Sequence, residues 1–438
     1  MTALAETLRL VDIGAVPVAT PTGRLVGARG LLLESVGCRL HTGQRCRVEL
    51  VDGSWLDAQV VGFRDKVSYL MPFKKAEGLV TGARVLPSPP VAGPLIGREW
   101  LGRMVNGLAE PIDGLGRLGG DAPLAPTPPS VNPLKKRPVD APLDVGVRAI
   151  NAMLTLGRGQ RVGLMAGSGV GKSVLLGLIT RQTVADVIVV GLIGERNREV
   201  REFVERSLGP EGLKRAVLVV APADESPLMR VRATELCHAV AAHYRDRGQN
   251  VLLLVDSLTR YAMALREVAL SLGEPPATRG YPPSVFSHLP QLVESAGNGE
   301  RPDGSMSAIY TVLAEGDDQQ DPVVDSARAI LDGHIVLTRE LAERGHYPAI
   351  DVQQSISRCM AQVVTPEHTL AARKLKAALA KHARVRDLIP LGAYQPGADP
   401  ETDRAVRLNP QIDAFLCQGT REDAPFAPCI DQLKALMA

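Results

Sequence analysis

The hydrophobic and polar positions of this chain follow three different patterns along its length. Between residues 22 and 88, short apolar runs are separated by glycine turns, which is typical of short strands in a small closed barrel. From residue 143, near-continuous apolar runs alternate with amphipathic stretches, which predicts a parallel sheet covered by helices on both faces. After about residue 360 the apolar runs stop, and we expect helices up to residue 438.

These patterns predict a multidomain α/β protein with an N-terminal barrel, a central α/β core and C-terminal helices. The segments are expected at residues 1–20 (an N-terminal docking segment), 21–90 (the β-barrel), 91–142 (an irregular, proline- and glycine-rich connector), 143–362 (the core) and 363–438 (a helical C-terminal domain). The core strands are expected at residues 161–165, 187–193, 216–220, 251–255, 308–313 and 333–337. No internal repeat is evident.

The N-terminal docking segment is the least defined of these parts. Leu4, Leu8 and Val11 stand at helical spacing in an otherwise short and mildly amphipathic stretch. This spacing fits a helix that docks on a partner, and it equally fits a frayed terminus or a helix packed on its own domain.

Charge and composition narrow the classes of function. The chain has 50 Lys and Arg against 48 Asp and Glu, a net charge of +2, so no global field attracts nucleic acid or a membrane surface. Aromatic residues make up 3% of the chain, which argues against a surface that stacks on bases. We therefore expect no nucleic-acid partner.

The cysteines and the apolar runs indicate where the protein works. Six cysteines are scattered without a C-x-x-C pair, which suits a reducing cytosol better than a disulfide framework or a zinc site. No secretion signal is visible at the N-terminus, and no apolar run approaches the ~18–20 residues that span a bilayer. We expect a soluble cytoplasmic protein that reaches a membrane only through partners.

The strongest chemical signal is the stretch LMAGSGVGKS at residues 164–173, a strand end followed by a glycine turn and a helix start. Backbone N–H groups in such a turn bind phosphate at the helix N-terminus. Lys172 can reach the β- and γ-phosphates of a nucleotide, and the Ser173 hydroxyl can bind Mg²⁺. The predicted phosphate-binding residues are Ala166, Gly167, Ser168, Gly169, Val170, Gly171, Lys172 and Ser173.

Two points qualify this stretch. The strict phosphate-binding pattern begins with glycine, and this chain has Ala166, which is tolerated if the backbone there has a negative φ. The alternative interpretation is a glycine-rich turn that binds no ligand.

Two carboxylates follow predicted core strands, where the chemistry of open α/β sheets is found. Asp256 follows the run at 251–255, and beside a phosphate-binding turn it is expected to anchor Mg²⁺, often through water. Taken alone, it would more often cap a helix. Glu195 follows the run at 187–193, where it either polarises the attacking water or merely opens the charged helix that comes next.

Arg358 lies far from the glycine turn in the sequence. It can be a structural cation at its own sheet edge, or a finger placed into the site of a neighbouring subunit. Arginine fingers contribute ~10³–10⁵ in rate. Spacing alone does not choose between these roles.

Five longer stretches carry a family resemblance: residues 194–200 (GERNREV), 254–263 (LVDSLTRYAM), 280–286 (GYPPSVF), 315–322 (EGDDQQDP) and 330–337 (ILDGHIVL). They resemble the type III secretion ATPases, which are relatives of the catalytic and non-catalytic subunits of rotary ATP synthases. Residues 221–228 (APADESPL) and 318–322 resemble the flagellum-specific export branch more than the injectisome branch. The resemblance covers about residues 22–360 and is most specific between 143 and 358.

The resemblance implies more than spacing does. It implies a RecA-like core and a homohexamer with nucleotide at the subunit interfaces. It makes Glu195 the general base, places Arg196 and Arg260 near the γ-phosphate, puts Tyr347 against the adenine and makes Arg358 a finger that acts in the neighbouring subunit. Ala166 also fits this branch.

The function that follows is Mg²⁺-dependent ATP hydrolysis that drives or assists export of flagellar proteins, through chaperone release or substrate unfolding. The implied partners are a stator-like regulator, a central stalk protein, export-gate membrane proteins and substrate–chaperone complexes. The protein is then cytoplasmic and peripherally associated with the inner membrane through the export apparatus. The resemblance does not identify the residues that touch export substrates.

Three alternatives stay open at this point. An injectisome ATPase would have the same chemistry and a different client. A hexameric nucleic-acid translocase of the Rho type also has a barrel before its core, but the few aromatic residues and the near-neutral charge oppose it. A non-catalytic nucleotide-binding scaffold subunit is opposed by Glu195, because such subunits tend to lack the base.

Overall fold

The computed structural model describes residues 21–89, 93–125, 132–167, 169–301, 303–314, 321–397 and 399–438. The chain divides into two compact units, Met1–Val91 and Ala92–Ala438. The docking segment predicted at residues 1–20 lies outside the described residues. The five predicted segment boundaries stay predictions.

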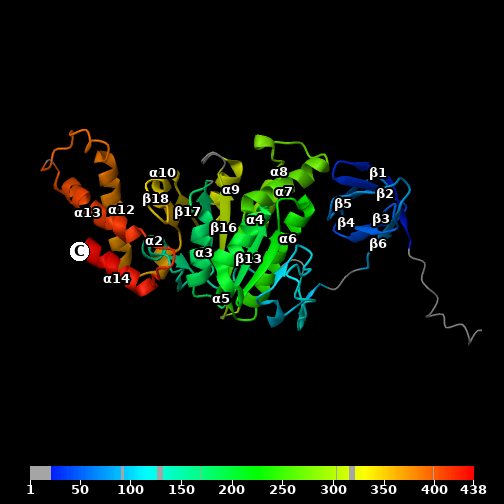
Figure 1. Cartoon of the computed structure of the whole chain (residues 1–438), viewed down its shortest axis with the longest axis horizontal. Coiled ribbons are helices and arrows are strands. Elements are labelled where there is room, and N and C mark those ends of the chain that lie inside the picture. The colour runs from blue at the N-terminus through cyan, green and yellow to red at the C-terminus, as the bar shows by residue number, and fades with distance from the viewer. Residues whose placement is uncertain are drawn as a thin grey trace, which may run out of the picture. The chain divides into compact units, whose positions relative to one another are not determined.

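The first unit is a closed barrel of six antiparallel strands in the order β1-β2-β5-β4-β3-β6 (Figure 1). The strands are β1 (Gly23–Arg29), β2 (Leu32–Val36), β3 (Arg45–Glu49), β4 (Trp55–Arg64), β5 (Val67–Pro72) and β6 (Arg84–Pro87). In β3 the buried Cys46 and Val48 alternate with the exposed Arg45 and Arg47, as a strand with one face on a core requires. The predicted barrel is confirmed, although the sequence did not single out β6.

The second unit is built on an eight-stranded sheet in the order β18-β17-β12-β16-β15-β13-β14-β8. Its strands are β8 (Met104–Val105), β12 (Arg161–Ala166), β13 (Val187–Ile193), β14 (Ala216–Ala221), β15 (Asn250–Asp256), β16 (Ser305–Leu313), β17 (Gly333–Leu337) and β18 (Ile350–Ser357). All neighbouring strands are parallel except β17 and β18. The predicted parallel core is thus confirmed, with one antiparallel edge strand that the sequence did not predict.

Helices cover the sheet on both faces, as the near-continuous apolar strands require (Figure 1). The longer ones are α3 (Lys172–Gln182), α6 (Pro227–Arg245), α7 (Leu258–Ser271), α8 (Pro283–Glu294) and α9 (Pro322–Ile330). Shorter helices are α2 (Arg148–Met153), α4 (Asn197–Glu202), α5 (Gly209–Leu213), α10 (Arg339–Glu343) and α11 (Met360–Val363), and a π-helical turn covers Phe203–Leu208.

The sequence predicts the connector as an irregular segment, but the structure shows several short strands in it. It contains β7 (Leu95–Ile96), β9 (Ala122–Pro123) and β10 (Pro142–Leu143), and β10 pairs with β11 (Leu156–Gly157). Its β8 joins the main sheet beside β14. Trp100 is fully buried, and its indole N–H donates to the carbonyl of Leu95 at 2.9 Å. Two-residue strands among prolines and glycines leave no periodicity that a sequence pattern could detect.

The chain ends in three helices, α12 (Pro366–Val385), α13 (Pro400–Leu416) and α14 (Phe426–Met437), which confirms the predicted helical C-terminus. Thr365 caps α12 by accepting a hydrogen bond from the His368 backbone N–H. The helices pack against α2 of the core, where the Asn151 amide donates to the carbonyl of Ala424 at 3.0 Å. In the part of the chain that the structure describes, no helix has the length and apolarity that crossing a membrane demands.

Candidate functional site

The glycine turn joins β12 to α3 at the carboxyl edge of the sheet. Gly169 and Gly171 have φ of 79° and 90°, in the left-handed region that favours glycine. Ala166 ends β12 with the ordinary backbone of a strand, which explains why alanine is tolerated there. The first backbone N–H groups of α3 have no partner within the helix and can receive an anion.

The other residues of the turn differ in their exposure. Gly167, Gly169, Gly171 and Ser173 line a cavity. The Val170 side chain is buried in the core, so Val170 contributes only its backbone to the turn. Ser168 lies outside the described residues.

Lys172 meets two carboxylates that come from neighbouring strands. Its Nζ lies 2.6 Å from Asp256 Oδ1 and 3.2 Å from Glu195 Oε1. Asp256 ends β15 and Glu195 follows β13, and these adjacent parallel strands place Leu192 opposite Asp256. All three side chains are at most 13% exposed. The structure therefore brings together the three groups that the sequence placed at separate strand ends.

The structure removes the simplest alternative for Asp256. The residue that caps α7 is Ser257, whose hydroxyl accepts from the Arg260 backbone N–H at 3.2 Å. Asp256 instead accepts from the Thr311 hydroxyl at 2.6 Å, in addition to Lys172. Thr311 lies on β16, between the glycine-turn strand and the Asp256 strand. The sequence does not single out this residue, because one threonine inside an apolar run is common in strands without a function.

The three charged groups perturb one another. Burial raises the pKa of the Asp256 carboxyl, and the charge of Lys172 offsets this rise only in part. Burial and a hydrogen bond with Glu199 raise the pKa of Glu195. Burial alone would lower the pKa of Lys172, but its two carboxylate neighbours outweigh that effect and the net shift is upward. Lys172 is therefore held charged, beside carboxylates that bind protons more readily than exposed ones.

The cavity in front of these groups has a volume of about 530 Å³. It brings together Lys172, Ser173, Glu195, Arg196 and Arg260. Its other lining residues are Ala166, Gly167, Gly169, Gly171, Val174, Gly194, Glu199, Leu313, Ala314 and Arg339. The lining thus combines a glycine turn with arginines and carboxylates, which suits a phosphate chain.

Gly194 sets the approach of Arg260 to this cavity. Its φ is 71°, and a Cβ built on it would lie 2.9 Å from both Cβ and Cγ of Arg260. The stem of Arg260 therefore packs directly on the backbone between β13 and Glu195. The Arg196 side chain is not packed in this way. It is 84% exposed, and it lies 3.8 Å from Glu199.

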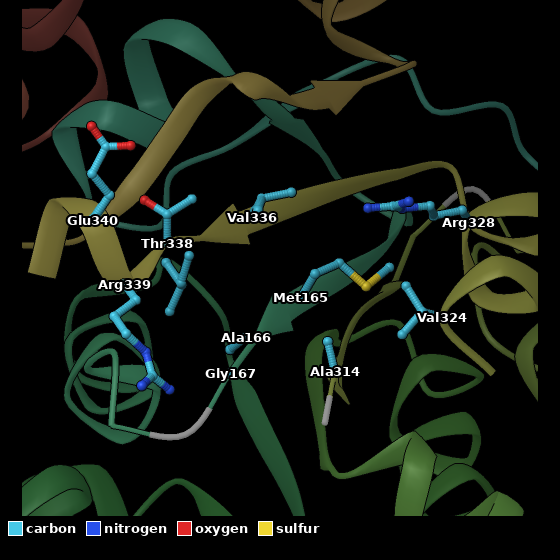
Figure 2. Close-up of a pocket in the computed structure, with 11 residues that line it drawn as sticks. Met165, Ala166, Gly167, Ala314, Val324, Arg328, Val336, Thr338, Arg339 and Glu340 are labelled. Atoms are coloured by element: carbon cyan, nitrogen blue, oxygen red, sulfur yellow. The ribbon is translucent and has the colours of Figure 1, made fainter. Parts of the chain in front are cut away.

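A second, smaller cavity of about 200 Å³ adjoins the glycine turn between β12, β17 and α9 (Figure 2). Met165, Val324 and Val336 supply apolar walls, and Figure 2 shows Arg339 extending from the start of α10 toward the glycine turn. Arg339 lines both cavities. The sequence does not single out Arg339, because nothing distinguishes one arginine after a strand from a solvated one.

Tyr347 lies beside the glycine turn. A Cβ built on Gly171 would be 3.4 Å from Cε1 of the Tyr347 ring, which is 46% exposed. The carbonyl of Tyr347 accepts from the Gln418 backbone N–H at 2.9 Å, so the tyrosine is also attached to the end of α13.

Arg358 lies at the edge of the sheet where β12 and β17 begin, opposite to the carboxyl edge that carries the glycine turn. It follows β18, which runs antiparallel to β17, so Ser357 pairs with Gly333 at the start of β17. Its backbone N–H donates to Asp332 at 3.0 Å, and its Nη2 donates to the carbonyl of Arg328 at 3.1 Å. At roughly 3.3 Å per residue, the length of β12 separates it from its own glycine turn by about 16 Å. Among the described residues, the structure does not bring Arg358 to the other site residues of the same chain.

The sequence is similar to two protein families and to relatives from other bacteria. The sequence model of the ATP synthase alpha/beta family, nucleotide-binding domain, matches residues 146–357, and that of the T3SS EscN ATPase C-terminal domain matches residues 364–435. The flagellum-specific ATP synthase of Pseudomonas aeruginosa is 52% identical over 431 residues, covering 98% of this chain and 95% of the relative. That of Salmonella typhimurium is 53% identical over 430 residues, covering 96% and 94%.

Solved structures agree with these relatives. The assembled ATPase EscN from the type III secretion system of enteropathogenic E. coli matches with a TM-score of 0.90 at 40% identity, covering 95% of this chain and all of EscN. EscN in complex with its central stalk EscO matches with a TM-score of 0.86 at the same identity and coverage.

Proposed function

Because this chain belongs to the family of flagellum-specific ATP synthases and is an ATPase of type III export, we propose that it hydrolyses ATP in the cavity at the carboxyl ends of β12, β13 and β15. The observation that carries this proposal is the contact of Lys172 with both Asp256 and Glu195 beside the glycine turn. One ammonium of the cavity lining thereby contacts both a candidate base of the same lining and a candidate metal-binding carboxylate buried behind it.

The glycine turn holds the phosphates. The N–H groups of residues 167–173 surround the β-phosphate at the N-terminus of α3, and Lys172 turns from its carboxylate partners to the β- and γ-phosphates. Arg260 and Arg196, which line the same cavity, balance the charge that develops on the γ-phosphate. Tyr347, next to Gly171, lies where the adenine can pack on its ring.

The donor set of the cavity suits Mg²⁺. Ser173 supplies a hydroxyl at the cavity wall, and Asp256 supplies a carboxylate at the end of β15. Mg²⁺ prefers oxygen ligands and is commonly held by one or two protein groups together with substrate phosphates and water. Bound there, it would neutralise charge on the β- and γ-phosphate oxygens.

Glu195 is the proposed general base. Water attacks the γ-phosphorus in line with the bond to the leaving ADP oxygen, and Glu195 takes the proton that this water loses. The raised pKa of Glu195, caused by burial and Glu199, makes it a better proton acceptor than an exposed carboxylate.

Arg358 cannot reach this cavity within its own chain, so we propose that it acts on the nucleotide of a neighbouring subunit. This requires a ring, and a homohexamer with a central stalk is supported by the likeness to assembled EscN and to EscN bound to its stalk EscO. The remaining proposed partners are a stator-like regulator, the export-gate membrane proteins and substrate–chaperone complexes, whose release or unfolding would use the ATP. These partners would place a cytoplasmic ATPase at the inner membrane.

The test measures the ATPase rate against protein concentration, with and without Mg²⁺, for the wild type and Arg358→Ala. We expect the specific activity of the wild type to rise cooperatively with concentration and to require Mg²⁺. Arg358→Ala should be inactive at every concentration while sizing shows that it still assembles. A specific activity that is flat and survives the substitution, in samples shown to be monomeric, would contradict catalysis at subunit interfaces.

A further inference from the structure

The edge strand β18 is interrupted just before Arg358. Asp351 pairs with Val336 and Ile356 pairs with His334, so the four residues 352–355 of β18 lie opposite a single residue of β17. Such a bulge bends a strand and changes the direction of the side chains that follow it. Arg358 comes three residues after the last residue of the bulge. The bulge therefore determines the backbone position from which the Arg358 side chain extends.

Side chains hold the bulge in one shape from within the sheet. The Ser355 hydroxyl accepts from the Val336 backbone N–H at 2.9 Å and donates to the carbonyl of Asp351 at 2.5 Å. The Asp351 carboxylate accepts from the backbone N–H groups of Gln353 and Gln354, at 2.8 and 3.0 Å. The bulge is therefore a built feature and not a frayed strand end.

Lys376 holds the same bulge from the C-terminal helices. It lies in the middle of α12, and its Nζ donates to the carbonyl of Ser355 at 3.0 Å. Its side chain is partly buried, and burial lowers its pKa while Asp351 opposes the shift. A lysine that gives up hydration to hold one backbone carbonyl restrains that carbonyl more than a solvated lysine would.

Several positively charged side chains also lie at this edge of the sheet, near Arg358. Burial lowers the pKa of His334, and the nearby positive charges of Arg328, Arg358 and Lys376 lower it further. Of the carboxylates at this edge, Asp332 is bound in a bidentate ion pair by Arg161, and Asp351 accepts backbone N–H groups within the bulge. The cations near Arg358 therefore fit an anionic group such as the phosphates of a bound nucleotide.

We propose that Lys376 is a positioning residue for Arg358, which fixes the bulge of β18 from α12 and so aims the arginine at the phosphates bound by a neighbouring copy of this chain. This inference rests on the proposed role of Arg358. It ties the C-terminal helices to the catalytic arginine, so a displacement of α12 changes the rate of the neighbouring site.

The test uses full-length subunits in mixed rings. Subunits with Lys172→Ala lack a working glycine turn but still supply Arg358, and subunits with Arg358→Ala have the opposite defect. Mixing them restores activity at interfaces where the two intact halves meet. Lys376→Ala is then added either to the Lys172→Ala subunit, which supplies the arginine, or to the Arg358→Ala subunit, which has none to position.

We expect an asymmetric result. In the arginine-supplying subunit, Lys376→Ala should lower the restored kcat about tenfold or more and leave the KM for ATP within about twofold, because misplacing one group acts on the transition state. In the other subunit it should leave the restored rate unchanged. Lys376→Arg in the arginine-supplying subunit should recover most of the loss, since it keeps a donor for Ser355.

Lys374 provides the matched control. It lies two residues away on α12 and donates to the carbonyl of Met437 at 3.2 Å, within the C-terminal helices. Lys374→Ala in the arginine-supplying subunit should not change the restored rate. An equal loss from Lys376→Ala in either subunit, or no loss in both, would overturn the positioning role. If the reference mixture of Lys172→Ala and Arg358→Ala restores nothing, the proposed function of Arg358 fails first, and this inference fails with it.

Discussion

Lys172 Nζ lies 2.6 Å from Asp256 Oδ1, so the lysine of the glycine turn and the last residue of β15 form a buried ion pair. Thr311 holds the same carboxylate oxygen at 2.6 Å from the strand in between. This ion pair serves two purposes. It keeps a lysine charged inside the cavity, and together with Thr311 it connects the start of α3 to the strands β15 and β16 at the edge where phosphate is expected to bind.

Lys172→Ala should therefore affect both binding and stability. Removing the ammonium takes away the cation for the β- and γ-phosphates, and nucleotide binding should be lost in a titration with a fluorescent ATP analogue. The carboxylate of Asp256 would then stay buried without its partner, and breaking a buried pair costs about 3–5 kcal/mol. Denaturant unfolding measures this second effect.

An exposed lysine separates these effects from the loss of any positive charge. Lys214 is 70% exposed and pairs with Glu211 on the surface, so Lys214→Ala should change the free energy of unfolding by less than about 0.5 kcal/mol and leave ATP binding intact. Wild-type ATP affinity in Lys172→Ala would rule out the assigned phosphate site.

Glu195→Gln should bind ATP and barely hydrolyse it. The amide keeps the size of the side chain and a contact with Lys172 but cannot take a proton, so the turnover number should fall by about 10²–10⁴. Glu202→Gln is a suitable control, since that carboxylate pairs with Arg198 on the exposed side of α4. Single-turnover hydrolysis with bound nucleotide is the measurement, and near-normal turnover would assign the base to another residue.

Gly194→Ala should lower kcat in addition to the stability that backbone strain removes, because the new Cβ displaces Arg260. Alanine at φ 71° costs about 1–2 kcal/mol, and its Cβ would also lie 2.9 Å from Arg260, which must move. Gly392 has nearly the same φ, 67°, and open space around it, so Gly392→Ala carries a similar strain without the contact. We expect both variants to lose stability and only Gly194→Ala to lose kcat. Equal kcat values would mean that Arg260 has room to adjust.

How much of the site the sequence predicts depends on how local each signal is. Lys172, Asp256 and Glu195 each follow an apolar strand, and parallel strands bring such positions to one edge, so their meeting follows from the pattern. Thr311 and Arg339 reach the same place but give no local signal, because a threonine in an apolar run and an arginine at a helix start occur in many sites without function.

The fold shows the same limit. The sequence predicts the strands with near-continuous apolar runs, but it misses β18, whose residues IDVQQSIS alternate poorly because four of them form the bulge. Arg358 could not be located without β18. Its antiparallel direction puts the arginine at the edge opposite to the glycine turn, and direction is a property of the sheet topology that spacing along the chain does not contain.

A pair of residues outside the catalytic cavity makes stability depend on pH. His238 on α6 is fully buried, its Nδ1 lies 2.9 Å from the carbonyl of Thr234 and its Nε2 lies 2.8 Å from the Tyr310 hydroxyl. A carbonyl can only accept, so Nδ1 carries the proton and the neutral Nε2 accepts from Tyr310. Burial lowers the pKa of His238 to about 4, below the value of ~6.5 expected in the unfolded chain.

The unfolded state therefore binds more protons than the folded state between pH ~6.5 and 4, and the free energy of unfolding must fall as the pH falls through this window. Between pH 7 and 5, His238 should account for a loss of about 2 kcal/mol. His238→Gln keeps hydrogen-bonding groups but does not titrate, so denaturant unfolding at both pH values should show a smaller loss than the wild type by this amount. His41→Gln, at an exposed position of the barrel, should follow the wild type, and a His238→Gln variant that also follows it would show that this histidine does not contribute to acid sensitivity.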